Sequence, residues 1–320
     1  GIVSLLVVLF SACSDKDLSS KESSSKIFTE ITDAESGIDF RNDLTVTDSM
    51  NFFNYGYFYM GGGVAVGDFN SDGLEDVFFT GNMVENQLYM NTGDLQFKNI
   101  TKLSGIESQQ KWYTGATIAD VNQDGLEDIY ISVAGRWASR KNELWINQGP
   151  DEAGVPQFSE EADAYGIADS SYSIQSVFFD YDNDGDLDLL VGNYEPTRFD
   201  SYSFEYKKKL DNNTWTASDH LYQNDGNGNF TDVTAAAGIQ NFGLTIGVLA
   251  NDFNQDGYID IYLSNDFSTP DRFFINKGDG TFENHIEESF THTSFYGMGV
   301  DAADFNQDGK LDIFQLDMSP

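Results

Sequence analysis

Carboxylate and amide side chains recur with one spacing in five short segments of the chain. The pattern D-x-[DN]-x-D-G-x-x-D begins at Asp68, Asp120, Asp180, Asp252 and Asp304. Oxygen atoms at alternate positions suit calcium, which takes six to eight ligands from carboxylates, amides, backbone carbonyls and water. Glycine at position 6 allows the sharp turn that carries the chain around an ion. The segments therefore predict up to five calcium sites.

In each predicted loop we expect the side chains at positions 1, 3, 5 and 9 and the backbone carbonyl at position 7 to bind the ion. Ordinary turns also use Asp, Asn and Gly, but they need only one or two of them. So many acidic side chains close together would repel one another without a cation. The expected ligands are Asp68, Asn70, Asp72, Leu74 and Asp76; Asp120, Asn122, Asp124, Leu126 and Asp128; Asp180, Asp182, Asp184, Asp186 and Asp188; Asp252, Asn254, Asp256, Tyr258 and Asp260; and Asp304, Asn306, Asp308, Lys310 and Asp312.

These loops differ from EF-hands. An EF-hand needs a bidentate Glu at position 12 and a helix on either side. Position 12 here is Phe79, Ile131, Val191, Leu263 and Gln315 in turn, and the flanking segments read as strands. An Asp at position 9 in all five loops instead closes a hairpin.

The loops belong to a longer repeat. Their starts are 52, 60, 72 and 52 residues apart, and a second motif, such as "NQLYMNTGDLQF" from Asn86, follows the first four. Each unit reads as four short strands, with the loop between the first and second and a glycine turn between the third and fourth. The predicted fold class is all-β, a β-propeller of four-stranded antiparallel blades. The alternative is an open sandwich of hairpins.

The N-terminal and C-terminal segments of the sequence predict how a ring of blades would close. Residues 26–38 match the fourth-strand segments of later repeats, and the fifth unit stops after its second strand. We therefore expect residues 26–320 to hold about four and a half blades plus an N-terminal closing strand, as a C-terminally truncated part of a ring of seven.

The N-terminal residues resemble an export signal. An apolar run over residues 2–10 is too short to span a bilayer and leads to Ser11, Ala12 and Cys13, the only cysteine. We interpret residues 1–13 as a truncated lipoprotein signal with Cys13 as the lipidation site, and residues 14–25 as a flexible tether. A chance cysteine in an ordinary secretory signal is the alternative. The expected location is the outer membrane or cell surface of a Gram-negative bacterium, with membrane contact only through the lipid.

The charge of the chain excludes one class of partner. It has 17 Lys+Arg against 53 Asp+Glu, for a net charge of −36. Such a chain repels phosphate backbones, so we expect no nucleic-acid binding.

The Asp-rich hairpins with "VAVGDFN" before the loop resemble FG-GAP/VCBS repeats, the propeller blades also found in integrin α-chain heads. "FFDYDNDGDLDLLVGN" and "MGVDAADFNQDGKLDIFQLDMSP" look like the VCBS-repeat lipoproteins of Bacteroidetes-type bacteria, some of which carry a C-terminal ASPIC/UnbV module. The resemblance covers roughly residues 26–320. It implies a calcium-binding propeller that is secreted or anchored at the surface, but no single activity.

Strand alternation puts the predicted calcium loops on one face and leaves the other face for a glycan or protein ligand. Residues 194–218 form a long insertion on that second face. A repeated position eight residues before each loop is also aromatic in three units, and glycine recurs three residues later, at Gly63, Gly115, Gly247 and Gly299, as expected where first strands crowd together. Anchoring of the insertion and packing between blades are the alternative roles of these aromatic side chains. The candidate ligand-binding residues are Phe199, Tyr202, Tyr206, Lys207, Lys208, Lys209 and Trp215 in the insertion, and Trp112, Tyr172 and Tyr296 in the repeated position.

Catalytic patterns are weak. The three histidines, His220, His285 and His292, have no metal-binding spacing, and His220 reads as a surface residue of a strand. No nucleophile elbow or phosphate loop occurs. We expect a non-enzymatic recognition or adhesion module with no catalytic residues. A calcium-dependent polysaccharide lyase and a purely structural scaffold are the alternatives.

Overall fold

A computed structural model describes residues 28–194, 208, 218–241, 243–267 and 269–318. The predicted signal, tether and lipidation site Cys13 lie outside these residues. So do Phe199, Tyr202, Tyr206, Lys207, Lys209 and Trp215 of the insertion, whereas Lys208 is described and is exposed. Among the described residues, no helix has the length and apolar character that a membrane crossing requires.

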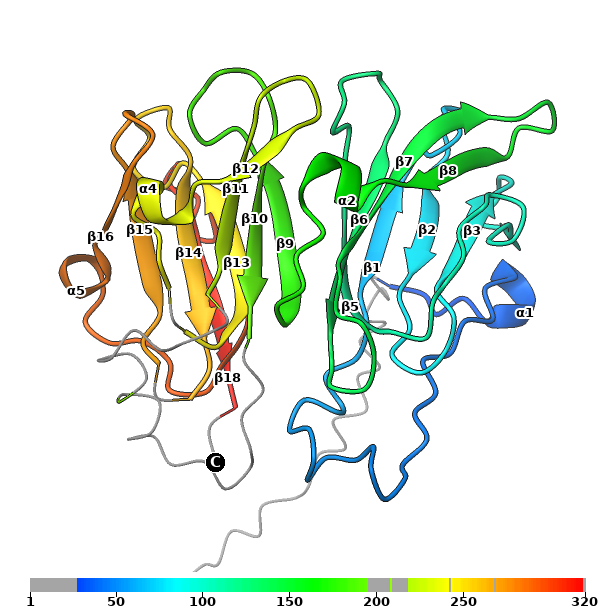
Figure 1. Ribbon diagram of the computed structural model, residues 1–320, viewed down its shortest axis with the longest axis horizontal. Coiled ribbons are helices and arrows are strands. Elements are labelled where there is room, and N and C mark those ends of the chain that lie inside the picture. Colours follow the sequence, from blue (N-terminus) through cyan, green and yellow to red (C-terminus); the bar gives the residue numbers. More distant parts are fainter. Residues whose placement is uncertain (1–27, 195–207, 209–217, 242, 268, 319–320) are drawn as a thin grey trace, which may run out of the picture. The chain divides into compact units, whose positions relative to one another are not determined.

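The described chain is all-β, as predicted (Figure 1). Four sheets of four antiparallel strands follow one another, and a sheet of two strands comes last. The sheets are β1 (Val64–Gly67), β2 (Asp76–Phe79), β3 (Gln87–Asn91) and β4 (Phe97–Asn99); β5 (Trp112–Ala119), β6 (Asp128–Ala134), β7 (Glu143–Pro150) and β8 (Pro156–Glu160); β9 (Ser173–Phe179), β10 (Asp188–Asn193), β11 (His220–Asn224) and β12 (Phe230–Asp232); β13 (Thr245–Asn251), β14 (Asp260–Asn265), β15 (Arg272–Asn276) and β16 (Phe282–Asn284); and β17 (Gly297–Ala303) with β18 (Asp312–Asp317).

Each sheet is a blade of the propeller type. Within the four-stranded sheets each strand pairs with its neighbour in sequence, and the first strands β1, β5, β9, β13 and β17 contact one another in that order. The predicted crowding between first strands occurs at Gly63 and Gly115. A Cβ at Gly63 would lie 2.7 Å from the backbone nitrogen of Ala116, and a Cβ at Gly115 would lie 2.7 Å from the carbonyl oxygen of Ile174. Glycine is therefore required where one blade packs closely on the next.

A turn follows each fourth strand, and after β4, β8 and β12 it contains a glycine that packs on the next blade. It contains a helix of four residues in three blades: α2 (Ala162–Tyr165), α4 (Thr234–Ala237) and α5 (Ile286–Ser289). The glycines of four such turns have φ of 78–81°, and a Cβ on any of them would lie 2.4–3.3 Å from a phenylalanine carbonyl oxygen in the next fourth strand. The pairs are Gly37 with Phe97, Gly105 with Phe158, Gly166 with Phe230, and Gly238 with Phe282.

The same turn precedes the first blade. Helix α1 (Asp33–Ser36) and Gly37 pack on β4 as the later turns pack on their neighbours. The prediction of a strand before it is not met, because residues 28–32 have no strand assignment. A three-residue fourth strand needs a third strand beside it to supply hydrogen bonds.

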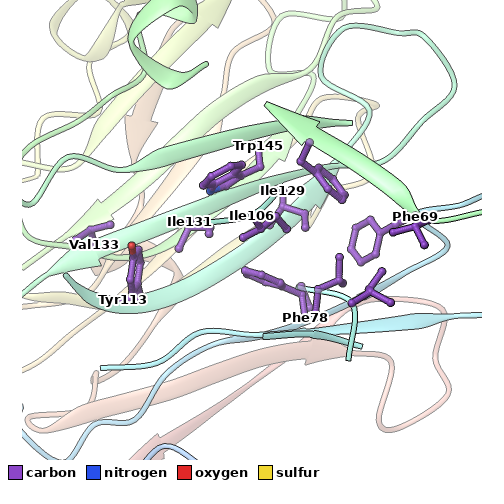
Figure 2. Packing of buried hydrophobic residues seen from close by; sticks show 13 residues of the cluster. Phe69, Phe78, Ile106, Tyr113, Ile129, Ile131, Val133 and Trp145 are labelled. Atoms are coloured by element: carbon purple, nitrogen blue, oxygen red, sulfur yellow. The ribbon is translucent and has the colours of Figure 1, made fainter. Parts of the chain in front are cut away.

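The core lies between the blades. Figure 2 shows the cluster between the first two sheets, where Phe69 and Phe78 of the first blade approach Ile129, Ile131 and Trp145 of the second. Phe69, Phe78, Ile129 and Ile131 are fully buried. Burial of this size stabilises the packing of one blade on the next by about 1.5–3 kcal/mol for each large side chain.

Candidate metal centres and the opposite face

The five Asp-rich segments, which we call the Asp loops, all lie between the first and second strands of a sheet. In every case the Asp at position 9 is the first residue of the second strand: Asp76, Asp128, Asp188, Asp260 and Asp312. Strands rather than helices flank the loops, so the prediction that they are not EF-hands is confirmed.

The five loops share one backbone conformation. The carboxylate at position 1 accepts hydrogen bonds from the backbone N–H groups of positions 5 and 6, at 3.0–3.1 Å and 2.8–3.0 Å. The residue at position 4 is left-handed, with φ of 58–63°, although it is not glycine, and the glycine at position 6 has φ of 84–95°. This curvature brings the backbone N–H groups of positions 5 and 6 to the carboxylate at position 1 in every loop.

The Asp at position 9 holds the loop to the sheet. Asp128 is fully buried, and its two oxygens accept hydrogen bonds from the backbone N–H groups of Val121 (3.0 Å) and Asn147 (2.8 Å). Asp76, Asp188 and Asp260 do the same in their blades. Burial raises the pKa of Asp76, Asp128 and Asp188 from 3.8 to about 7, and the neighbouring loop carboxylates raise it further against the opposing hydrogen bonds.

The third loop concentrates negative charge most strongly. Carboxylate oxygens of Asp180, Asp182 and Asp188 lie within 4.8 Å of one another. One oxygen of Asp182 accepts from Gln223 at 2.7 Å, while the other, Oδ1, is buried without a hydrogen-bond partner. Burial raises the pKa of Asp182, and the charge of Asp184 raises it further. A buried, unpartnered oxygen among carboxylates matches the donor set of a hard cation such as calcium.

The other four loops carry Asn at position 3. Its amide nitrogen donates to the carboxylate at position 5, at 2.9–3.2 Å, and its oxygen accepts from the backbone there. The amide hydrogen bond stabilises the negative charge of the carboxylate at position 5. The third loop lacks this hydrogen bond, because its position 3 is the carboxylate of Asp182. The amide oxygen also remains the type of ligand that calcium takes from Asn.

Neighbouring loops are tied together, which sequence reasoning did not anticipate. The amide at position 4 of one loop donates to the carbonyl of the position 6 glycine in the next: Gln123 to Gly185 (3.1 Å), Asn183 to Gly257 (3.1 Å) and Gln255 to Gly309 (2.6 Å). Position 4 has an amide side chain in four of the five loops, so the signal was present in the repeat. It could not be interpreted without knowing which loops are adjacent.

The opposite face is covered by a segment outside the repeat, residues 39–61, which we call the strap. In Figure 1 it is the blue segment that runs past the ends of the strands. It bonds to the first blade through Asn42 and Asn82 (2.7 Å), and to the second through Ser49 and the indole N–H of Trp137 (3.2 Å). The strap thus connects separate blades on what we call the strap face.

Aromatic side chains of the strap form a cluster over the ends of the first strands. Tyr55 and Phe58 are 1% and 0% exposed and pack on Trp112, with ring centroids 5.6 and 5.4 Å apart. Tyr57 stacks edge-on against Tyr194 of the third blade, 4.1 Å between centroids, and its hydroxyl donates to Asp266 of the fourth. Sequence reasoning missed these residues because the strap has no counterpart in the repeat.

The aromatic candidates in the repeated position are in three different environments. Trp112 is 4% exposed, because Tyr55 and Phe58 of the strap cover its ring, so the ring is not a stacking platform at the surface. Tyr172 is half-buried beneath the guanidinium of Arg140, 4.2 Å from the ring centroid. Tyr296 is half-buried against Phe267 and Phe295. Packing is therefore the observed role of Trp112, as the alternative interpretation holds.

The prediction for His220 is wrong. Its side chain is mostly buried, and its Nδ1 lies 2.6 Å from Asp169 of the preceding connection. Desolvation acts to lower the pKa of His220, but the hydrogen bond to Asp169 outweighs it, so the pKa is raised. The sequence could not show that Asp169, in the connection before this blade, lies against the side chain of His220.

Comparison with known proteins gives the family. The family model of the FG-GAP-like repeat matches residues 40–131, 211–263 and 252–314. The chain belongs to the FG-GAP-like repeat family. Each matched span contains at least one Asp loop, and the spans together include the loops that begin at Asp68, Asp120, Asp252 and Asp304.

The chain is similar in sequence to two vertebrate proteins. Human cartilage acidic protein 1 is 24% identical over 243 residues, which are 74% of this chain and 33% of that protein. Integrin alpha-4 of Xenopus laevis is 28% identical over 149 residues, 42% of this chain and 14% of that protein. The match thus spans about a third of the length of the human and mouse cartilage acidic proteins.

Proposed function

We propose that this chain is a non-enzymatic recognition module outside the cytoplasm, stiffened by calcium in its Asp loops and presenting the strap face to a ligand. The observation that carries the metal assignment is Asp182, whose buried Oδ1 has no partner among three converging carboxylates. Bound calcium would neutralise that cluster and hold positions 1, 3, 5 and 9 together.

The arrangement of the two faces supports a division of roles. On the Asp-loop face, side chains are engaged with backbone groups of the same loop or the next one. The strap face carries aromatic side chains, including the exposed Phe53 and Tyr59. Exposed aromatic groups on a rigid scaffold are typical of recognition surfaces. Membership of the FG-GAP-like repeat family, which also relates the chain to an integrin alpha chain, supports a role in recognition or adhesion.

Thermal unfolding tests the metal assignment. Calcium at one hundred times its dissociation constant adds about 2.7 kcal/mol for one site, so chelation of several sites should lower Tm by about 10 °C or more. Added calcium should restore Tm, and equilibrium dialysis should find the ion bound. An unchanged Tm together with no bound calcium would refute the assignment.

A pair of variants sharpens this test. Asp182→Ala removes one charge and one predicted ligand side chain from the third loop and should reduce the calcium-induced rise in Tm. The matched control is Glu152→Gln, which removes one charge from an exposed residue of the hairpin between β7 and β8. If both variants respond equally to calcium, the third loop is not a site.

A further inference from the structure

A cavity of about 520 Å³ opens on the strap face between the first and second blades. It is lined by residues 82–85 after β2, by residues 108–112 between the two blades, and by Met50, Trp137 and Ala138. Its size is within the range of cavities that hold small ligands. Among the candidate ligand-binding residues that the structure describes, Trp112 lines the cavity, whereas Tyr172, Tyr296 and Lys208 do not.

The floor of this cavity, which we call the groove, is a fixed aromatic surface. Trp137 is half-buried and packs on Trp112 and Tyr55, with centroids 5.2 and 5.5 Å apart. Its indole N–H donates to the carbonyl of Ser49, which sets the orientation of the ring. Met50 and Met83, both half-buried, extend the apolar surface. A ligand therefore meets a ring that is already held in place.

The rim offers polar groups that the described residues leave unused. Gln109, Gln110 and Glu85 are exposed, and their side chains form no hydrogen bond or ion pair with the described part of the chain. Two amides can donate and accept, and the carboxylate can accept from two donors. The groove thus combines one apolar floor with several separate hydrogen-bonding groups around it.

The charged groups around the groove disfavour anionic ligands. Lys111 lines the groove, but its ammonium is buried and lies 2.7 Å from Glu143, so it is neutralised. Glu85 and the net charge of −36 repel anions. Phosphates, sulfates and uronic acids are therefore poor ligands for this groove.

We propose that the groove binds a neutral oligosaccharide, an inference that rests on the proposed recognition function of the strap face. The C–H face of a sugar ring covers the apolar surface of Trp137, and its hydroxyls pair with Gln109, Gln110 and Glu85. A hydrocarbon ligand would leave these polar groups unpaired. A cationic peptide would pair with Glu85 and the aromatic ring but would make little use of the two amides.

Isothermal titration calorimetry of the calcium-saturated protein tests the proposal. The probes are maltohexaose, cellohexaose, xylohexaose and mannohexaose, with a galacturonic acid oligomer and hexalysine as comparators. At least one neutral oligosaccharide should bind, and the uronic acid oligomer should not. Trp137→Ala should weaken binding by up to about tenfold. Gln110→Ala, an exposed change, should weaken it about threefold to tenfold.

Glu152→Gln, on the hairpin between β7 and β8, is the control that should leave saccharide binding unchanged. If hexalysine binds, no saccharide binds, and Glu85→Gln abolishes the binding of hexalysine, the groove is a cation site and the proposal is overturned. If Trp137→Ala and Gln110→Ala both leave saccharide binding unchanged, the binding site lies outside this groove and the proposal is overturned. If no saccharide binds while Tm still responds to calcium, this inference fails and the calcium-stiffened module stands.

Discussion

The Asp-loop face and the strap face are built in opposite ways. On the Asp-loop face, one nine-residue conformation is repeated five times and is held by hydrogen bonds over four or five residues. On the strap face, one unrepeated segment reaches four blades through contacts as distant in sequence as Tyr57 and Asp266. The comparison teaches that the repeat encodes each blade, whereas the strap joins particular blades.

The largest effect is expected on the strap face. Tyr55→Ala removes a fully buried ring from between Trp112 and Trp137 and should lower the free energy of unfolding by about 3–5 kcal/mol. Urea unfolding measures it, and the loss should be equal with calcium and with chelator. Phe53→Ala, in the same segment but 79% exposed, is the control and should change stability by less than about 0.5 kcal/mol. Equal effects of the two changes would contradict the buried role of the strap.

A smaller effect is expected at position 9 of the Asp loops. Asp128→Ala leaves the N–H groups of Val121 and Asn147 buried without partners and should cost about 3 kcal/mol in chelator. Asp312→Ala is the matched control, because Asp312 is only half-buried and accepts one backbone hydrogen bond, from Phe305. It should cost about 1 kcal/mol. If the two losses in urea unfolding are the same, burial does not distinguish these positions.

A further expected effect concerns pH. Burial raises the pKa of Asp76, Asp128 and Asp188 from 3.8 to about 7, so the folded state binds protons more tightly than the unfolded state. In chelator, stability should therefore fall as pH rises from 5 to 8. Calcium should reduce the fall, because it stabilises the charged carboxylates. Urea unfolding at both pH values checks this, and a calcium-free protein that is more stable at pH 8 would contradict it.

Much of the fold could be predicted because its signals are local. The Asp at position 9 begins the second strand in all five loops, and the glycine turns separate third from fourth strands in the expected order. The one predicted strand that is not observed, at residues 28–32, depends on a partner strand rather than on its own residues. His220 was misjudged for a related reason, since Asp169 comes from the connection before its blade.

The sequence by itself determined the repeated blade, the five Asp loops and the exclusion of helix-flanked calcium sites, because each depends on spacings of a few residues. Only the tertiary structure decided which loops are tied together, that Asp182 has an unpartnered oxygen, and that the strap covers Trp112 and helps to form the groove. These features join residues that are 40 to 200 positions apart. Their contacts arise from the packing of blades, which no local pattern encodes.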